Sequence, residues 1–197
     1  MITITQEMIE HFKYRTGFHL WCVHKWTNRI AALNDKRIDL DTLFDERDRH
    51  DEYKWLTPEY EPYLFISWGY KCRRTGVDFI LPDSIKEQMN EATFHHIKSH
   101  RHHPEFWDDN VTIAALNKGD RDRPAAGQMV DGTKMPMSYV AAMVADWFAM
   151  SEELGSHPAK WAADNINVRW KFTNEQIGLI NDLIADVWEP VNLGGVI

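Results

Sequence analysis

Apolar residues recur at three- and four-residue steps through much of the chain, a spacing that brings them to one face of an α-helix. The N-terminal stretch shows this most clearly and predicts a helix over roughly residues 5–33. Its apolar positions are Ile9, Phe12, Leu20, Val23 and Ile30. Thr3 and Gln6 have capping-box spacing ahead of this helix. Gly17 is a point at which the helix could bend or be interrupted.

Helical patterns and helix-end signals continue along the rest of the chain. Thr57-Pro58 is typical of a helix start, Gly155 of a helix end, and Thr173 with Gln176 of a capping box. The patterns predict six further helices with the approximate bounds 41–55, 58–73, 82–100, 136–153, 159–165 and 174–188. Strand signals are nearly absent. We therefore predict one all-α domain over residues 1–197.

One stretch, residues 117–135, lacks any helical pattern. Its sequence, NKGDRDRPAAGQMVDGTKM, is dominated by Gly, Pro, Asp and Lys. Such a composition is typical of a surface loop. We expect this loop to act as a lid, with residues 120–134 controlling access to a site.

Composition narrows the possible partners. Hydrophobic residues make up 44% of the 197 positions, which is enough for a substantial core. The formal net charge of −8 argues against binding to duplex nucleic acid, which requires clustered Lys and Arg, but it permits a small anionic substrate. The only cysteines, Cys22 and Cys72, favour neither a disulfide framework nor a cysteine zinc site. Without a signal-peptide pattern or a membrane-length apolar run, the expected location is the cytoplasm.

The most informative motif is the dipeptide His50-Asp51. It offers a neutral imidazole and a carboxylate to one metal ion, and a carboxylate can bridge to a second ion. His24 lies upstream, one turn after Leu20, where it is expected to face inward. A lone histidine on an apolar face is more often a satisfied core residue, and for His24 by itself that alternative holds.

Asp146 interrupts a strongly apolar helical segment, SYVAAMVADWFAM. An unpaired carboxylate on a buried face is costly, and a metal ion would offset the cost. The alternatives are an N–H or Arg partner elsewhere, or a helix face that is not buried. We favour the metal interpretation.

A second histidine-rich motif is the segment FHHIKSHRHHPEFW. Five of nine consecutive positions are histidine: His95, His96, His100, His102 and His103. The segment could be a solvated or adventitiously metal-binding tract, but its apolar residues favour a packed helix end and loop. Lys98 and Arg101 in it, and Lys54 three residues after Asp51, are candidate contacts for an anionic substrate. The alternative for these cations is a solvated face, and we favour function for Lys54.

Taken together, these residues resemble the HD superfamily of metal-dependent phosphohydrolases, and more closely a small HD-like family of bacteria and their phages. The resemblance extends roughly from His24 to Trp161 and rests on four anchors. These are His24-Lys25, His50-Asp51 through Lys54 with TPEYEPY, His96 through the His-His-Pro turn to Trp107, and Met143 to Trp147. The family usually has a small residue where this chain has Tyr53, and Asn where this chain has His100. These two differences leave the substrate preference open.

The resemblance implies an all-α HD bundle and a specific set of ligands. His24, His50, Asp51 and Asp146 would hold one divalent ion, and Asp51 would bridge to a second. His96 and either His102 or His103 would complete the second site. The site would hold one or two divalent ions, and the candidate metals are Mn, Fe, Zn, Ni and Mg.

The resemblance favours hydrolysis of a phosphoester, most simply in a nucleotide, by metal-activated water, with Asp51 and Lys54 as catalytic residues. Lys54, Lys98 and Arg101 would bind the phosphate. Two alternatives stay open: a di-iron oxygenase of the HD type, and a non-catalytic helical interaction protein. HD-like proteins often form homodimers, and the location would be the bacterial cytoplasm, or the host cytoplasm for a phage protein.

Overall fold

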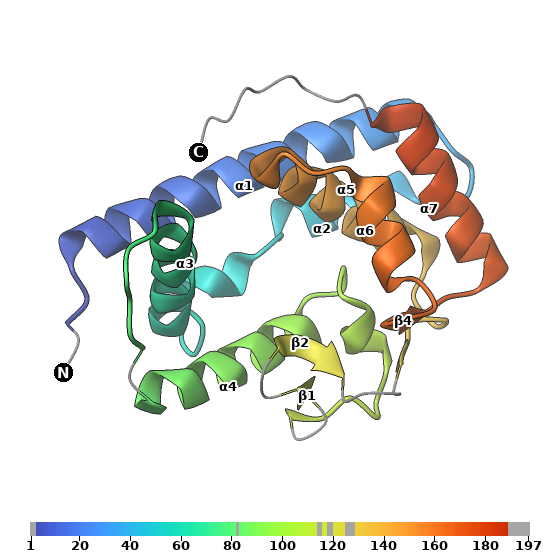
Figure 1. The fold of residues 1–197 in the computed structure, drawn as a ribbon. Coiled ribbons are helices and arrows are strands. Elements are labelled where there is room, and N and C mark those ends of the chain that lie inside the picture. Colours follow the sequence, from blue (N-terminus) through green and yellow to red (C-terminus); the bar gives the residue numbers. More distant parts are fainter. Residues whose placement is uncertain (1–2, 82, 114–115, 118–119, 125–128, 189–197) are drawn as a thin grey trace.

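Seven α-helices account for most of the residues that the structure describes (Figure 1). The computed structural model describes residues 3–81, 83–113, 116–117, 120–124 and 129–188. The helices are α1 (Gln6–Ala32), α2 (Leu40–Asp48), α3 (Tyr60–Thr75), α4 (Asp83–Ser99), α5 (Met137–Leu154), α6 (Pro158–Asn165) and α7 (Asn174–Val187). Two short 3₁₀ helices, η1 (Glu52–Trp55) and η2 (Pro104–Trp107), follow α2 and α4. The all-α class predicted from the sequence is confirmed.

Most helix ends follow the local signals in the sequence. Thr173 and Gln176 form a complete capping box before α7, and Gly155 ends α5 in the left-handed conformation. At the first helix, Thr5 rather than Thr3 is the N-cap, because its side chain accepts from Met8 N. The helix then runs without interruption through Gly17.

Two predicted helix bounds are wrong. The second helix ends at Asp48 instead of continuing to residue 55, so His50 and Asp51 lie in the turn that follows it. The third begins at Tyr60 with Glu59 as its cap, so Thr57-Pro58 does not start it. The fourth begins at Asp83, and Pro82, its predicted start, lies outside the described residues.

The expected loop at 117–135 contains strands where it is described. β1 (Leu116–Asn117) pairs antiparallel with β2 (Asp120–Pro124), and β3 (Val130–Asp131) pairs parallel with β4 (Trp170–Lys171). Residues 118–119 and 125–128 of the expected lid lie outside the described residues. The β3–β4 pair ties this segment to the chain between α6 and α7.

The core lies between α1, α5 and α7. The side chains of Trp26, Phe148 and Leu179 are fully buried there, and Trp26 packs against Phe148 with ring centroids 5.3 Å apart. Figure 1 shows α1 along one edge of the molecule and α4 along the opposite edge, with α3 between them. This arrangement brings one end of α4 and the middle of α1 and α5 towards a common centre. Among the described helices, none combines the length and apolar character needed to cross a bilayer.

Candidate metal centre

The turn after α2 directs both residues of the His-Asp motif into the protein. Arg49 caps α2, and Asp51 then adopts the left-handed backbone conformation, with φ 59° and ψ 19°. Asp and Asn adopt this conformation more readily than most residues because their short polar side chains tolerate it. The reversal leaves His50 4% and Asp51 1% exposed. A helix continued through this motif, as the sequence predicted, would have separated the two side chains by about 100° around its axis.

Two long helices complete the first group of ligand atoms. His19 from α1 places Nε2 at 3.3 Å from His50 Nε2, 3.1 Å from Asp146 Oδ1 and 3.6 Å from Asp51 Oδ2. His50 Nε2 lies 3.7 Å from Asp146 Oδ1 and 3.8 Å from Asp51 Oδ2. The Asp146 side chain comes from α5 and is 19% exposed. Two imidazoles and two carboxylates thus converge on one point.

His24, which the resemblance placed in this group, does not belong to it. His19 takes the expected position, and His24 is exposed on α1. Five residues of α-helix correspond to a rotation of about 140°, so the two side chains cannot share one face. His19 lies on the buried stripe of α1 with Thr16, Val23 and Trp26. The structure therefore does not bring His24 to the group of ligand atoms that the sequence predicted for it.

The separations in this group fit a single transition-metal ion. Bonds of about 2.0–2.2 Å to nitrogen and oxygen require neighbouring ligands to lie about 2.8–3.6 Å apart, from octahedral to tetrahedral angles. Three of the five separations, 3.1, 3.3 and 3.6 Å, lie within this range, and the other two, 3.7 and 3.8 Å, lie just above it. His19 Nε2 and His50 Nε2 face each other at 3.3 Å. The donor set fits a bound cation.

A second group lies at the end of α4 and shares Asp51 with the first. His96 Nε2 is 3.3 Å from Asp51 Oδ1, the oxygen opposite the one that faces His19. One set of ligand atoms within 4.8 Å of one another comes from His96, His102 and His103, and another from Asp51, His96 and His100. Both His102 and His103 therefore reach this group, and the structure adds His100 to them. Asp51 is positioned to bridge two cations.

Three buried atoms of this second group have no hydrogen-bond partner among the described residues. They are His100 Nε2, His103 Nε2 and Asp51 Oδ1. Buried polar groups are almost always satisfied, because each unsatisfied one costs about 1–3 kcal/mol. Three such atoms around one point are the arrangement that a cation would satisfy.

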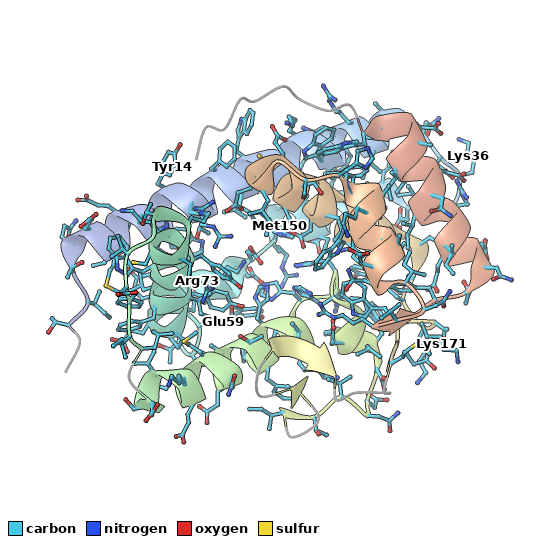
Figure 2. The ribbon with its side chains drawn as sticks, in the orientation of Figure 1. Tyr14, Lys36, Glu59, Arg73, Met150 and Lys171 are labelled. Carbon is cyan, nitrogen blue, oxygen red and sulfur yellow. The ribbon has the colours of Figure 1, made fainter. Side chains whose placement is uncertain are left out.

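Buried carboxylates fix the rings of the histidines from behind. Glu59, which precedes α3, accepts from His96 Nδ1 at 3.0 Å and from His95 Nδ1 at 2.7 Å, and Figure 2 shows it at the start of α3 next to α4. Glu46 from α2 accepts from His102 Nδ1 at 2.9 Å. With Nδ1 donating, Nε2 of His96 and of His102 carries the free lone pair that a metal ion needs. Metal-binding histidines in proteins are generally held in this way.

The electrostatics favour an anionic Asp51 and neutral imidazoles, whereas burial raises the pKa of Glu59 to about 7. Burial raises the pKa of Asp51, but the charges of Lys54 and the surrounding histidines outweigh it and hold the pKa well below the usual value. Burial also lowers the pKa of His96 and His103 well below the usual value, and that of His100 to about 4. Unprotonated rings beside ionised carboxylates are the states that bind metal.

We expect Glu59→Gln to weaken metal binding by about 10–100-fold while the fold is kept. Glutamine retains an acceptor for one ring but removes the charge that raises the basicity of His96. Titration of metal-free protein with Mn²⁺ or Zn²⁺, followed by calorimetry, measures the change. The matched control is Glu61→Gln in the first turn of α3, outside this network. Equal affinities of the Glu59 variant and the control would contradict the assigned role.

A cavity of about 370 Å³ opens onto the two groups of ligands. Its wall includes three cationic side chains: Lys54, Arg15 and Arg169. Lys54 Nζ lies 2.5 Å from Asp51 Oδ2, as the spacing in the sequence suggested. Arg15 pairs with Glu153 at 2.5 Å, and Arg169 with Glu105 at 3.0 Å. Cations beside a candidate metal centre suit an anionic ligand.

Lys98 and Arg101, predicted to bind substrate, do not line this cavity. Lys98 Nζ donates to the carbonyl oxygens of Glu105 and Asp108, each at 2.9 Å, and so holds the loop after α4. Arg101 is exposed and donates to the hydroxyl of Tyr139 at 2.9 Å. Both cations have structural partners that lie within ten residues or on the neighbouring α5.

Sequence reasoning missed several residues that the fold brings to the site. His19 carried a signal, since it shares the apolar stripe of α1 with Phe12 and Val23. Arg15 and Arg169 carried none, because each reaches the cavity only through the packing of distant elements. The same holds for Glu46 and Glu59, which look like ordinary surface glutamates in the sequence.

The fold and the site together define a helical protein with a buried cluster of histidine and aspartate side chains whose spacing could hold metal ions. The chain belongs to a family of unknown function, DUF5662, whose model matches residues 8–188. No curated protein and no solved structure shows significant similarity to it.

Proposed function

We propose that this protein is a metal-dependent phosphohydrolase of the HD type that acts on a nucleotide or another small phosphoester. The observation that carries the proposal is the position of Asp51. Its two oxygens face two separate groups of ligands, and Lys54 beside it lines the cavity. A carboxylate between two cation sites is typical of enzymes that transfer phosphoryl groups to water.

The order of the ligands supports an HD-like arrangement. They come from α1, from the turn after α2, from the end of α4 with the loop that follows, and from α5. A pair of divalent ions in such a site supplies a hydroxide nucleophile near neutral pH and neutralises charge on the phosphoryl oxygens. Four segments of the chain, two of them helices and two of them turns or loops at helix ends, therefore contribute ligands to this site.

The protein's own cations would orient the substrate. Lys54 points its ammonium at Asp51, where a phosphoryl oxygen would take over part of this contact. Arg15 and Arg169 are already paired with the buried Glu153 and Glu105. All three cations of the cavity wall thus have a carboxylate partner, and bound metal ions would supply most of the positive charge that faces a phosphate.

Metal content and phosphate release test the proposal together. We expect close to two equivalents of a transition metal in protein purified without an affinity tag or chelator, and phosphate release from nucleotides that needs this metal but no oxygen. Mass spectrometry and a phosphate assay give the two readings. Predominant iron with substrate-dependent oxygen consumption would point instead to an oxygenase. An absence of metal would leave an interaction protein as the better description.

Chelation should also destabilise the protein. An ion that binds only the folded chain stabilises it by about 2.7–4.1 kcal/mol at 100 to 1,000 times its dissociation constant. For a chain of this size, removal is expected to lower the melting temperature by roughly 5–15 °C. Scanning calorimetry before and after chelation, and after Mn²⁺ is added back, measures the shift. An unchanged melting temperature would argue against a metal centre in the core.

A further inference from the structure

Tryptophans from three elements form one wall of the cavity. Trp147 comes from α5, Trp161 from α6 and Trp170 from β4. Met150 and Leu154 of α5 line the same cavity, and Figure 2 shows Met150 between α3 and α6, towards the middle of the molecule. The candidate metal ligands and this aromatic wall therefore line the same cavity.

Two of the three indoles are held rigidly. The rings of Trp147 and Trp170 stack with centroids 5.6 Å apart and planes at 14°, and they are 5% and 3% exposed. Glu105, itself fully buried, accepts from Trp170 Nε1 at 2.8 Å and from Arg169 Nη2 at 3.0 Å. The Arg169 guanidinium lies 4.2 Å from the centroid of the Trp170 ring. This frame sets the position of the wall before any ligand arrives.

Trp161 differs from its two neighbours because part of its ring is accessible. It is 37% exposed, and it meets Trp170 edge-on, with centroids 6.2 Å apart and planes at 63°. Asn165, which is fully buried, donates from its side-chain amide to the Trp161 carbonyl at 2.8 Å and fixes this turn of α6. An accessible indole on a rigid support, beside a cavity, is a surface on which a planar ring can stack.

We propose that Trp161, backed by Trp147 and Trp170, is a subsite for a planar heteroaromatic ring, so that the substrate is a nucleoside phosphate whose base stacks on Trp161. The phosphate would then face Lys54 and the metal centre. This inference rests on the proposed function for the position of the phosphate, although the stacking subsite can be tested without catalysis. Stacking on an aromatic side chain is sequence-tolerant, because every base has a π-face.

The test separates base binding from hydrolysis. Saturation-transfer NMR with adenosine, guanosine, cytidine and uridine, and with ribose as the ligand without a base, measures binding directly. Phosphate release from the four nucleoside 5′-monophosphates and from ribose 5-phosphate gives the preference for a base. The variants are Trp161→Ala, Trp161→Phe and, as matched control, Trp21→Ala, since Trp21 is 57% exposed on α1 and does not line the cavity.

We expect nucleosides to bind and ribose not to, and monophosphates to be preferred over ribose 5-phosphate by about tenfold or more. Trp161→Ala should weaken nucleoside binding about tenfold, since the π-face is lost. The ratio of monophosphate turnover to ribose 5-phosphate turnover should then fall close to one. Trp161→Phe should retain most of both, and Trp21→Ala should behave as wild type. Circular dichroism and melting temperatures show whether each variant folds. If Trp161→Ala does not fold, nucleoside binding by Trp161→Phe tests the subsite in its place.

Two results would overturn the subsite. One is nucleoside binding that is undetectable or equal in wild type and in folded Trp161→Ala. The other is equal turnover of ribose 5-phosphate and the monophosphates, which would leave the proposed hydrolase intact. Conversely, nucleoside binding that depends on Trp161, without any phosphate release, would support the subsite and contradict the hydrolase.

Discussion

Asp51→Asn is expected to remove metal binding and phosphate release together. The substitution takes away the one carboxylate whose oxygens face both groups of ligands. Its effect should exceed the 10–100-fold loss that is typical when an outer partner of a ligand is changed. We therefore expect metal affinity and activity each to fall by more than about 100-fold. Metal analysis of the purified variant and a phosphate assay at saturating Mn²⁺ give both numbers.

Asparagine is a better replacement than alanine at this position. Asp51 has φ 59°, a conformation that Asn adopts readily and that costs alanine roughly 1–2 kcal/mol. Asn also keeps the size of the side chain beside Lys54, so the change isolates the charge. Asp48→Asn is the matched control, because its side chain is 56% exposed on α2. Retention of two metal equivalents by Asp51→Asn would exclude a bridging role for this carboxylate.

His19→Ala should empty the first metal site, whereas His24→Ala should leave it intact. His19 Nε2 lies within 3.6 Å of three other candidate ligand atoms, and His24 is exposed on the other side of α1. We expect the first variant to lose more than about 100-fold in affinity for one ion and the second to bind like wild type. Calorimetric titration of metal-free protein distinguishes the two.

The comparison of these two variants also tests which face of α1 lies against the candidate metal centre. Both are single deletions of an imidazole from one helix, and they differ only in the face they occupy. If His24→Ala loses the metal and His19→Ala does not, the centre described above is incorrect. Loss in both variants would indicate that α1 moves when the ion binds.

The helices could be predicted from the sequence because their signals are local. The capping box at Thr173 and the glycine at Gly155 act within a few residues of the ends they define. The apolar steps of α1 act within single turns, and they identify the stripe on which His19 lies. The chemistry of the site, a histidine-carboxylate centre, was also visible in the residue types.

The composition of the site depended on longer-range geometry that the sequence did not provide. The sequence pattern extended the second helix past its true end at Asp48 and so placed His50 and Asp51 on a helix. It also selected His24, whereas the structure brings His19, five positions earlier, to the group. The sequence could not show that Lys98 already has partners, because its acceptors are the backbone carbonyl oxygens of Glu105 and Asp108. Backbone acceptors do not depend on residue type and so cannot be recognised from the sequence. Glu59 and Arg169 acquire their roles only through packing between elements distant in the chain.

The origin of the ligands on four separate segments has a consequence for how the protein is made. α1 is synthesised before α5, which carries Asp146. A nascent chain that lacks α5 does not contain the complete first group of ligand atoms, so under the proposed function an ion would be acquired only after α5 has docked against α1. Metal supply in the cell would then govern the last step of maturation, and chains starved of metal would accumulate with a formed core and an inactive centre.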